Sequence, residues 1–209
     1  SNLTVLQRLG SCASTCRTLR IARQKLEAVS AQALEGLGPA LRVLDLRANA
    51  IRLLQEGALA RVGNVTRLRL GGNVLANVSA ALFQGLDRLQ HLEMDRNALT
   101  SLGSRAFGAL PALRSLQLQH NHISALLPDS FAGLSALQVL DLADNQLTSL
   151  GQNCFGGLPA LEVLVLSRNL LHDIAANTFT SLPSLGSLSL DGNKPLSSLG
   201  AGAFSGLGG

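Results

Sequence analysis

Seven asparagines recur at an interval of 24 residues, and this interval constrains the fold more than any other feature of the chain. They are Asn49, Asn73, Asn97, Asn121, Asn145, Asn169 and Asn193. Five of the six phenylalanines keep the same interval, at Phe83, Phe107, Phe131, Phe155 and Phe179, and Phe204 comes one residue late. A fixed interval of this length predicts stacked units that touch only their neighbours and together present one long surface.

Each unit predicts one short strand followed by a compact return. In the unit that begins at Leu137, Leu140 and Leu142 show the period of two expected of a strand with one buried face. The next large apolar residues, Leu150 and Phe155, follow at spacings unlike those of a long amphipathic helix, which indicates coil or a single short turn. Such a unit cannot bury its own apolar side chains, so its neighbours must cover them.

The string L-x-x-L-x-L-x-x-N-x-L, followed by L-x-x-x-x-F-x-x-L, resembles the 24-residue leucine-rich repeat of extracellular proteins such as Toll-like receptors, Slit-type guidance proteins and small leucine-rich proteoglycans. The resemblance implies an α/β repeat solenoid, with a parallel sheet on the concave face and coil or short turns on the convex face. It also implies a ladder of asparagine side chains along the turn. An Asn amide suits that position because it offers donors and an acceptor to backbone groups that the turn leaves unpaired.

We expect a single leucine-rich repeat domain over residues 1–209, with an N-terminal cap region at 1–16 and about eight repeats at 17–209. The first units depart from the pattern, since Gln24 replaces Asn and Leu34 and Leu59 replace Phe, as terminal repeats commonly do. The last residues contain no polar or cysteine-rich closing segment. We therefore expect the C-terminal cap to be missing, the chain to be a fragment, and a neighbouring domain or subunit to cover the open end.

Charge is distributed unevenly along the chain. Residues 1–69 hold 11 Lys/Arg and 4 Asp/Glu, a net charge of +7, whereas residues 70–209 hold 6 and 9, a net charge of −3. The basic residues lack interleaved aromatics, so no nucleic-acid partner is expected. A solvated surface and a patch that faces a polyanion such as a sulphated glycan both remain open. No stretch of about 18 apolar residues is present, so we expect no membrane insertion by this segment.

The three cysteines are Cys12, Cys16 and Cys154. The extracellular family that the chain resembles usually carries a four-cysteine N-terminal cap, and here only Cys12 and Cys16 precede the first predicted strand. We favour a disulfide between these two, which implies an oxidising compartment. The alternative is two free thiols in an intracellular chain. Cys154 directly precedes Phe155 and is expected to be a packed, inert thiol.

Three N-x-S/T sequences begin at Asn2, Asn64 and Asn77. Asn64 lies just before a predicted strand and Asn77 just after a predicted turn, both of which are surface positions. Each is a glycosylation site if the protein is secreted.

The sequence contains no pattern that predicts catalysis, a cofactor or a metal. His91 and His120 are expected to face outward on adjacent strands, but a metal site needs three or four converging ligands. A flat ladder instead spreads its side chains about 4.8 Å apart. Nucleophile elbow, Gly-rich phosphate loop and zinc motif are all absent from the sequence. An enzyme is therefore not expected.

The strand residues between the leucines form the predicted concave surface. Those of the middle units make one contiguous polar set, here called the concave patch: Arg67, Arg69, His91, Glu93, Asp95, Arg96, Gln117, Gln119 and His120. The flanking units are expected to supply smaller or less charged groups and so to bound the patch. Protein-binding hot spots favour Trp, Tyr and Arg. Tyr and Trp are absent from this chain, so of these three only arginine is available.

These features favour a non-enzymatic extracellular or cell-surface recognition module, a fragment of a receptor, adhesion or matrix protein that binds a protein or glycan through its concave face. One alternative is a structural repeat of a matrix, filament or cell-surface assembly. Another is an intracellular scaffold with reduced thiols, which the incomplete cysteine cap keeps open.

The cysteine assignment predicts one free thiol per chain. Alkylation of unfolded, unreduced protein should modify Cys154 alone, because Cys12 and Cys16 are bridged. Mass spectrometry of the alkylated protein counts the thiols. Three modified cysteines would remove the main argument for an oxidising compartment.

Overall fold

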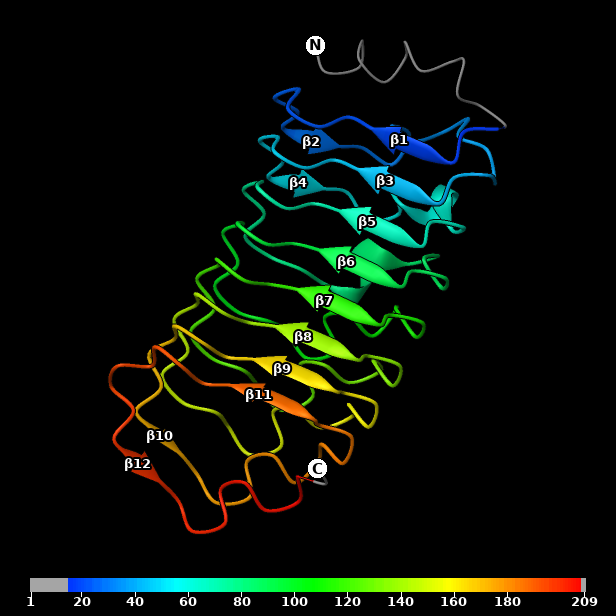
Figure 1. Ribbon diagram of the computed structural model, residues 1–209. Coiled ribbons are helices and arrows are strands. Elements are labelled where there is room, and N and C mark those ends of the chain that lie inside the picture. The colour runs from blue at the N-terminus through cyan, green and yellow to red at the C-terminus, as the bar shows by residue number, and fades with distance from the viewer. Residues whose placement is uncertain (1–14, 208–209) are drawn as a thin grey trace.

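The computed structural model describes residues 15–207 and shows a curved solenoid whose successive turns stack along one axis (Figure 1). One eight-stranded parallel sheet runs the length of the stack in the order β1-β3-β5-β6-β7-β8-β9-β11. Its strands are β1 (Thr18–Arg20), β3 (Val43–Asp45), β5 (Arg67–Arg69), β6 (His91–Glu93), β7 (Ser115–Gln117), β8 (Val139–Asp141), β9 (Val163–Val165) and β11 (Ser187–Ser189). The predicted parallel-sheet solenoid is confirmed.

The returns between these strands contain little regular structure. Two short parallel pairs, β2 (Ala28–Val29) with β4 (Leu53–Leu54) and β10 (Asp173–Ile174) with β12 (Ser198–Leu199), lie beyond the turns that follow the main strands (Figure 1). Within residues 15–207, helix is confined to the 3-10 segments η1 (Ala60–Val62) and η2 (Ala80–Phe83). The convex side is therefore coil and short turns, as expected, with two strand pairs that the sequence pattern did not indicate.

The register of the main sheet follows the 24-residue interval. Leu68 pairs with Leu92, Leu92 with Leu116, and Leu116 with Leu140, each buried at the centre of its strand. Because side chains of a strand alternate between its faces, the residues on either side of each leucine point to the concave surface. This register places equivalent residues of successive units side by side.

The phenylalanines form the second spine of the core. Phe83, Phe107, Phe131, Phe155 and Phe179 are all fully buried, and ring pairs stack at centroid distances from 5.8 Å (Phe83–Phe107) to 6.3 Å (Phe131–Phe155). Leu34 and Leu59 are buried in the first two units, so they do replace Phe in this spine. Phe204 stacks on Phe179 but is 40% exposed.

Cys154 occupies the small position before Phe155 and is completely buried, as predicted. Burial raises the pKa of its thiol to about 12, although backbone hydrogen bonds act in the opposite direction. A thiol with this pKa carries almost no thiolate at neutral pH and is chemically inert in the folded protein.

The buried row of phenylalanine rings predicts that truncating two different phenylalanines lowers the stability of the fold by different amounts. Truncation of Phe131 to Ala should lower the free energy of unfolding by about 3–5 kcal/mol, because it removes a fully buried ring and leaves a cavity. Phe204→Ala should cost clearly less, because that ring is part-exposed and covered by Phe179 on one side. Chemical denaturation of the two variants measures the difference, and equal losses would contradict the spine.

Candidate functional site

The sheet brings the concave patch together as the register predicts. Arg67 pairs with His91 in the first exposed column, and Arg69, Glu93 and Gln117 are successive partners in the second. Asp95 and Gln119 follow these strands, and Arg96 and His120 occupy the turns that come next. Most of these side chains are half-buried against their neighbours, whereas Arg96 and His120 are exposed.

A buried carboxylate, Asp45, organises the charges at the N-terminal border of this patch. It is 1% exposed and accepts hydrogen bonds from Arg20 Nε at 3.1 Å and Arg47 Nη2 at 2.9 Å. Arg69 Nη1 lies 3.7 Å from the same oxygen, Oδ2. Three guanidinium groups from three adjacent strands or strand ends thus converge on one carboxylate, which satisfies a charge that burial alone would make costly.

The pKa of Asp45 records this balance. Burial raises it, but the hydrogen bonds from the Arg47 side chain and backbone and from Arg20 outweigh burial and lower it to about 2. The carboxylate is therefore ionised throughout the physiological range, and its charge stabilises the folded chain.

The charge network extends over two further units, and a glycine lies beside it. Arg69 Nε donates to Glu93 Oε1 at 3.0 Å, and Arg47 Nη1 lies 3.8 Å from Glu93 Oε2. Gly71 is the repeat-equivalent residue between Arg47 and Asp95, and a Cβ at this position would lie 2.3 Å from Asp95 Oδ1. The missing side chain leaves room for the Asp95 carboxylate.

The expected N-terminal boundary of the patch is wrong. Arg20, Asp45 and Arg47 continue the charged surface through β3 to β1, because Arg69 is shared between Asp45 and Glu93. These residues stand at the repeat spacing in the same exposed columns, so the signal was present in the sequence. The sequence did not indicate, however, that Asp45 is buried and that three arginines converge on it.

A second group of charges follows the exits of the strands. Arg96 Nη1 lies 3.3 Å from Asp95 Oδ2, His120 Nδ1 lies 3.7 Å from Asp144 Oδ2, and Arg168 Nη2 lies 2.7 Å from the same oxygen of Asp144. The Arg168 hydrogen bonds lower the pKa of Asp144. Arg96, His120, Asp144 and Arg168 each precede a ladder asparagine and have φ between 51° and 57°, so they hold a left-handed conformation that is uncommon for non-glycine residues.

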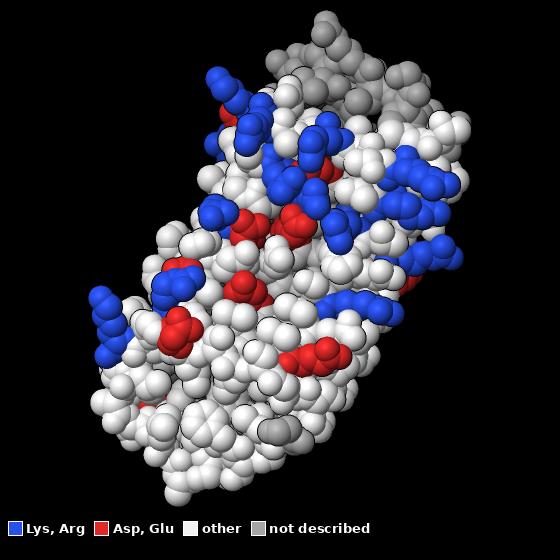
Figure 2. Space-filling view, viewed as in Figure 1, with Lys and Arg blue, Asp and Glu red and all other residues white. Residues whose placement is uncertain are grey.

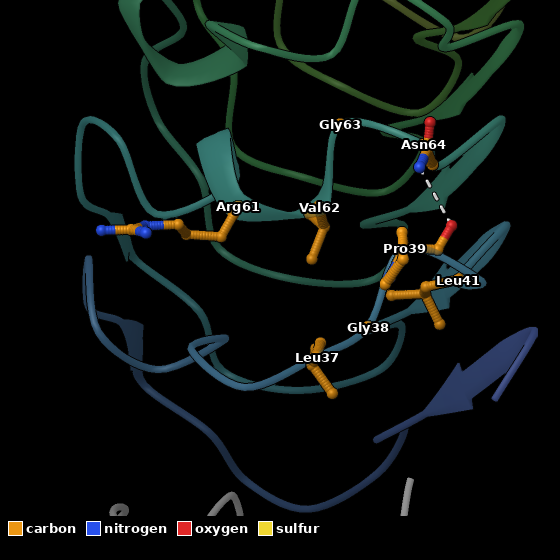
Figure 3. Close-up of a pocket in the computed structure, with 8 residues that line it drawn as sticks. All are labelled: Leu37, Gly38, Pro39, Leu41, Arg61, Val62, Gly63 and Asn64. Carbon is orange, nitrogen blue, oxygen red and sulfur yellow. Dashed lines mark hydrogen bonds between the residues drawn. The ribbon is translucent and has the colours of Figure 1, made fainter. Parts of the chain in front are cut away.

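A pocket of about 240 Å³ lies away from this surface, between the returns of the first two units (Figure 3). Leu37, Leu41 and Val62 supply its apolar wall, and Asn64 Nδ2 donates to Pro39 O at 3.0 Å. Arg61 is the only ionisable side chain among the lining residues. The pocket therefore has no acid–base pair or nucleophile with which to perform catalysis.

The remaining predicted sites are placed only in part. Asn64 is half-buried and Asn77 is exposed, whereas Asn2 and Cys12 lie outside the described residues, so glycosylation and the Cys12–Cys16 bridge stay predictions. Between residues 15 and 207, no group of three or more His, Cys, Asp or Glu side chains is arranged to hold a metal ion. Over the same residues, no helix is both long and apolar enough to cross a membrane.

The geometry defines a class of protein, a repeat solenoid with an open, charged concave face. A family model described as leucine rich repeat matches residues 14–75, 63–123, 88–147, 113–171, 135–195 and 159–209. The chain belongs to the leucine-rich repeat family.

Solved structures agree with this assignment, and a search of curated proteins found no match. A chain in the crystal structure of the mouse RP105/MD-1 complex is similar over 93% of this chain, with 29% sequence identity and a TM-score of 0.83. The similar region spans 33% of that chain, so this protein corresponds to about a third of its length. In all, 465 solved chains match, and a fold this common does not by itself identify a partner.

The low pKa of Asp45 predicts a stability term that depends on pH. Because the folded pKa is about 2 and the ordinary value is 3.8, the stabilisation is complete above pH 4 and is lost as the pH falls towards 2. In Asp45→Asn it should be absent at every pH, so wild type should exceed the variant by about 2 kcal/mol near neutrality. Urea denaturation across this pH range measures the gap.

Asp141→Asn supplies the control, because burial raises the pKa of Asp141. Its ionised carboxylate weakens the fold as pH rises, so the sign of its pH dependence should be opposite. A constant gap between wild type and Asp45→Asn from pH 7 to pH 2 would contradict the network.

Proposed function

We propose that this protein is a non-enzymatic extracellular recognition module that binds a protein or glycan partner through the concave patch. The observation that carries the proposal is the ladder of charged and polar side chains on β5, β6 and β7, held in fixed register by the sheet. Complementary charge on a partner would give fast, orientation-specific association with such a surface.

The likeness to a chain of the RP105/MD-1 complex supports a receptor, adhesion or matrix role, because that structure is itself an assembly. The candidate glycosylation sites Asn2, Asn64 and Asn77 and the proposed Cys12–Cys16 bridge favour an extracellular or cell-surface location. The existence of a binding partner for the whole protein is also part of this proposal, because the similar region covers only 33% of the chain in the RP105/MD-1 complex.

A structural role in a matrix, filament or cell-surface assembly is the second candidate. It is favoured by Leu53, Leu127 and Leu170, which lie outside the main sheet and are 51%, 50% and 45% exposed. Large apolar side chains exposed along a stack suit a second molecule packed against them. In this case the surface outside the main sheet, and not the concave face, would make the principal contact.

Gln117 offers a test that separates the concave face from the rest of the surface. In Gln117→Arg, the new guanidinium would stand between Glu93 and Asp141, its partners in the second column, so the fold should tolerate it. The matched control is Gln152→Arg on an exposed return. Wild type and both variants are applied to arrays of extracellular proteins and of glycans.

Signals that fall roughly tenfold or more in Gln117→Arg and persist in Gln152→Arg support concave-face recognition. Binding that survives both substitutions places the contact elsewhere. Wild-type protein that binds nothing on either array contradicts the recognition role and leaves the structural one.

A further inference from the structure

The arginines of the concave sheet fall into two electrostatic groups. Arg20, Arg47 and Arg69 each lie within 4.0 Å of a carboxylate, at Asp45 or Glu93. Arg17, Arg42, Arg67 and Arg114 form no such ion pair with any residue between 15 and 207. The charge of the first group is offset by carboxylates of the same chain, and the charge of the second group is not.

The second group lies along one edge of the sheet, where the strands begin. Arg42 N donates to Arg17 O at 2.8 Å, Thr66 N to Arg42 O at 2.8 Å, Gln90 N to Thr66 O at 2.9 Å, and Arg114 N to Gln90 O at 2.9 Å. These backbone bonds order the residues that precede β1, β3, β5, β6 and β7 into one row.

In two units the residue in this row is uncharged. In these units the first residue of the strand that follows carries the ionisable side chain. Arg67 follows Thr66 and His91 follows Gln90, and the two are direct partners in the sheet. Burial lowers the pKa of His91, and the charges of Arg67 and Arg114 lower it further, whereas Glu93 raises it. We call Arg17, Arg42, Arg67, His91 and Arg114 together the basic edge.

The basic edge has a defined end. The row continues through Gln138 to Glu162, whose side chains hydrogen-bond at 3.3 Å, so it changes sign beyond β8. Figure 2 shows the same division, with Lys and Arg gathered over the N-terminal half of the molecule and along the side of the sheet where the strands begin. From β1 to β7 the basic edge crosses four strand spacings, about 19 Å at about 4.8 Å each.

We propose that the basic edge binds a linear sulphated glycan that runs across the strands. A guanidinium group pairs with planar or tetrahedral oxyanions through two parallel hydrogen bonds, and arginines in four of the five units match a polymer that carries repeated anions. The chain has no Tyr or Trp, and five of its six phenylalanines are buried, so the stacking that single-stranded nucleic acids require is missing.

This surface overlaps the concave patch at two of its five residues. Arg17, Arg42 and Arg114 lie outside the concave patch, and only Arg67 and His91 belong to both. A glycan on the edge would therefore leave Gln117 and Gln119 accessible. The two proposals can fail independently, because the Gln117→Arg test alters no residue of the basic edge.

Heparin is the probe, and the experiment compares two triple variants with equal loss of charge. Arg17→Gln, Arg67→Gln and Arg114→Gln together remove three cations of the edge. Arg42 is kept because its Nη1 donates to Pro39 O at 2.7 Å and has a structural role. The control triple is Arg23→Gln, Arg105→Gln and Lys194→Gln, all exposed and away from this edge.

Dissociation constants are measured for the deglycosylated proteins over a range of salt concentrations. The edge triple should bind heparin roughly tenfold or more weakly at about 0.15 M salt, and its log–log salt slope should fall by about two to three, near one per lost contact. The control triple should keep an affinity within about twofold of wild type, after allowance for its lower net charge. Unchanged thermal midpoints show that both triples remain folded.

Three results would overturn the proposal. Equal weakening of both triples would mean that net charge alone attracts heparin. Wild type that fails to bind heparin at about 0.15 M salt would leave the edge a solvated surface. Single-stranded DNA that competes as well as heparin would show that the site does not select a sulphated glycan.

Discussion

The asparagine ladder is the interaction on which the rest of this structure depends. Asn121 shows its form: Nδ2 donates to Met94 O at 3.0 Å and Leu118 O at 2.9 Å, and Oδ1 accepts from Leu99 N at 3.1 Å. One side chain thus joins its own turn to the preceding unit in the place where backbone groups would otherwise be buried without partners. Six of the seven asparagines are buried, and Asn49, next to the atypical Gln24, is half-buried.

The ladder fixes the spacing of the units, and the spacing decides which charges meet. Ion pairs between equivalent or neighbouring positions of successive units, such as Arg69–Glu93 and Arg168–Asp144, connect residues 24 apart in sequence. Most of the ion pairs join residues of the same or adjacent units, and the Arg47–Glu93 pair at 3.8 Å crosses the unit in which Gly71 has no side chain. Arginines at the strand exits form ion pairs because carboxylates lie beside them in the same or adjacent units. Within the described residues, the arginines of the basic edge form none because no carboxylate occupies the neighbouring positions.

The fold was predictable from the sequence because its determinants are periodic. The positions of Asn, Leu and Phe predicted the strands, the register and both buried spines, and the register in turn placed the concave patch. The electrostatics of the patch were less predictable. The burial of Asp45 and the division of Arg69 between two carboxylates depend on side-chain conformation and on the depth of packing, which an exposed column in a sequence does not encode. The β2–β4 and β10–β12 pairs were missed for a related reason, because two residues are too few to show a period.

The physical separation between core and surface explains how such a chain can acquire binding specificity. The asparagines, leucines and phenylalanines that stabilise the stack are buried, whereas the residues beside each central leucine are free to differ from unit to unit. Successive partners in the second column are Arg69, Glu93, Gln117, Asp141 and Val165 on one continuous backbone. Because each unit contacts only its neighbours, a substitution there changes the local surface and leaves distant units unaffected. Asp45 is the exception, since its burial ties the stability of the first three units to the charges that they display.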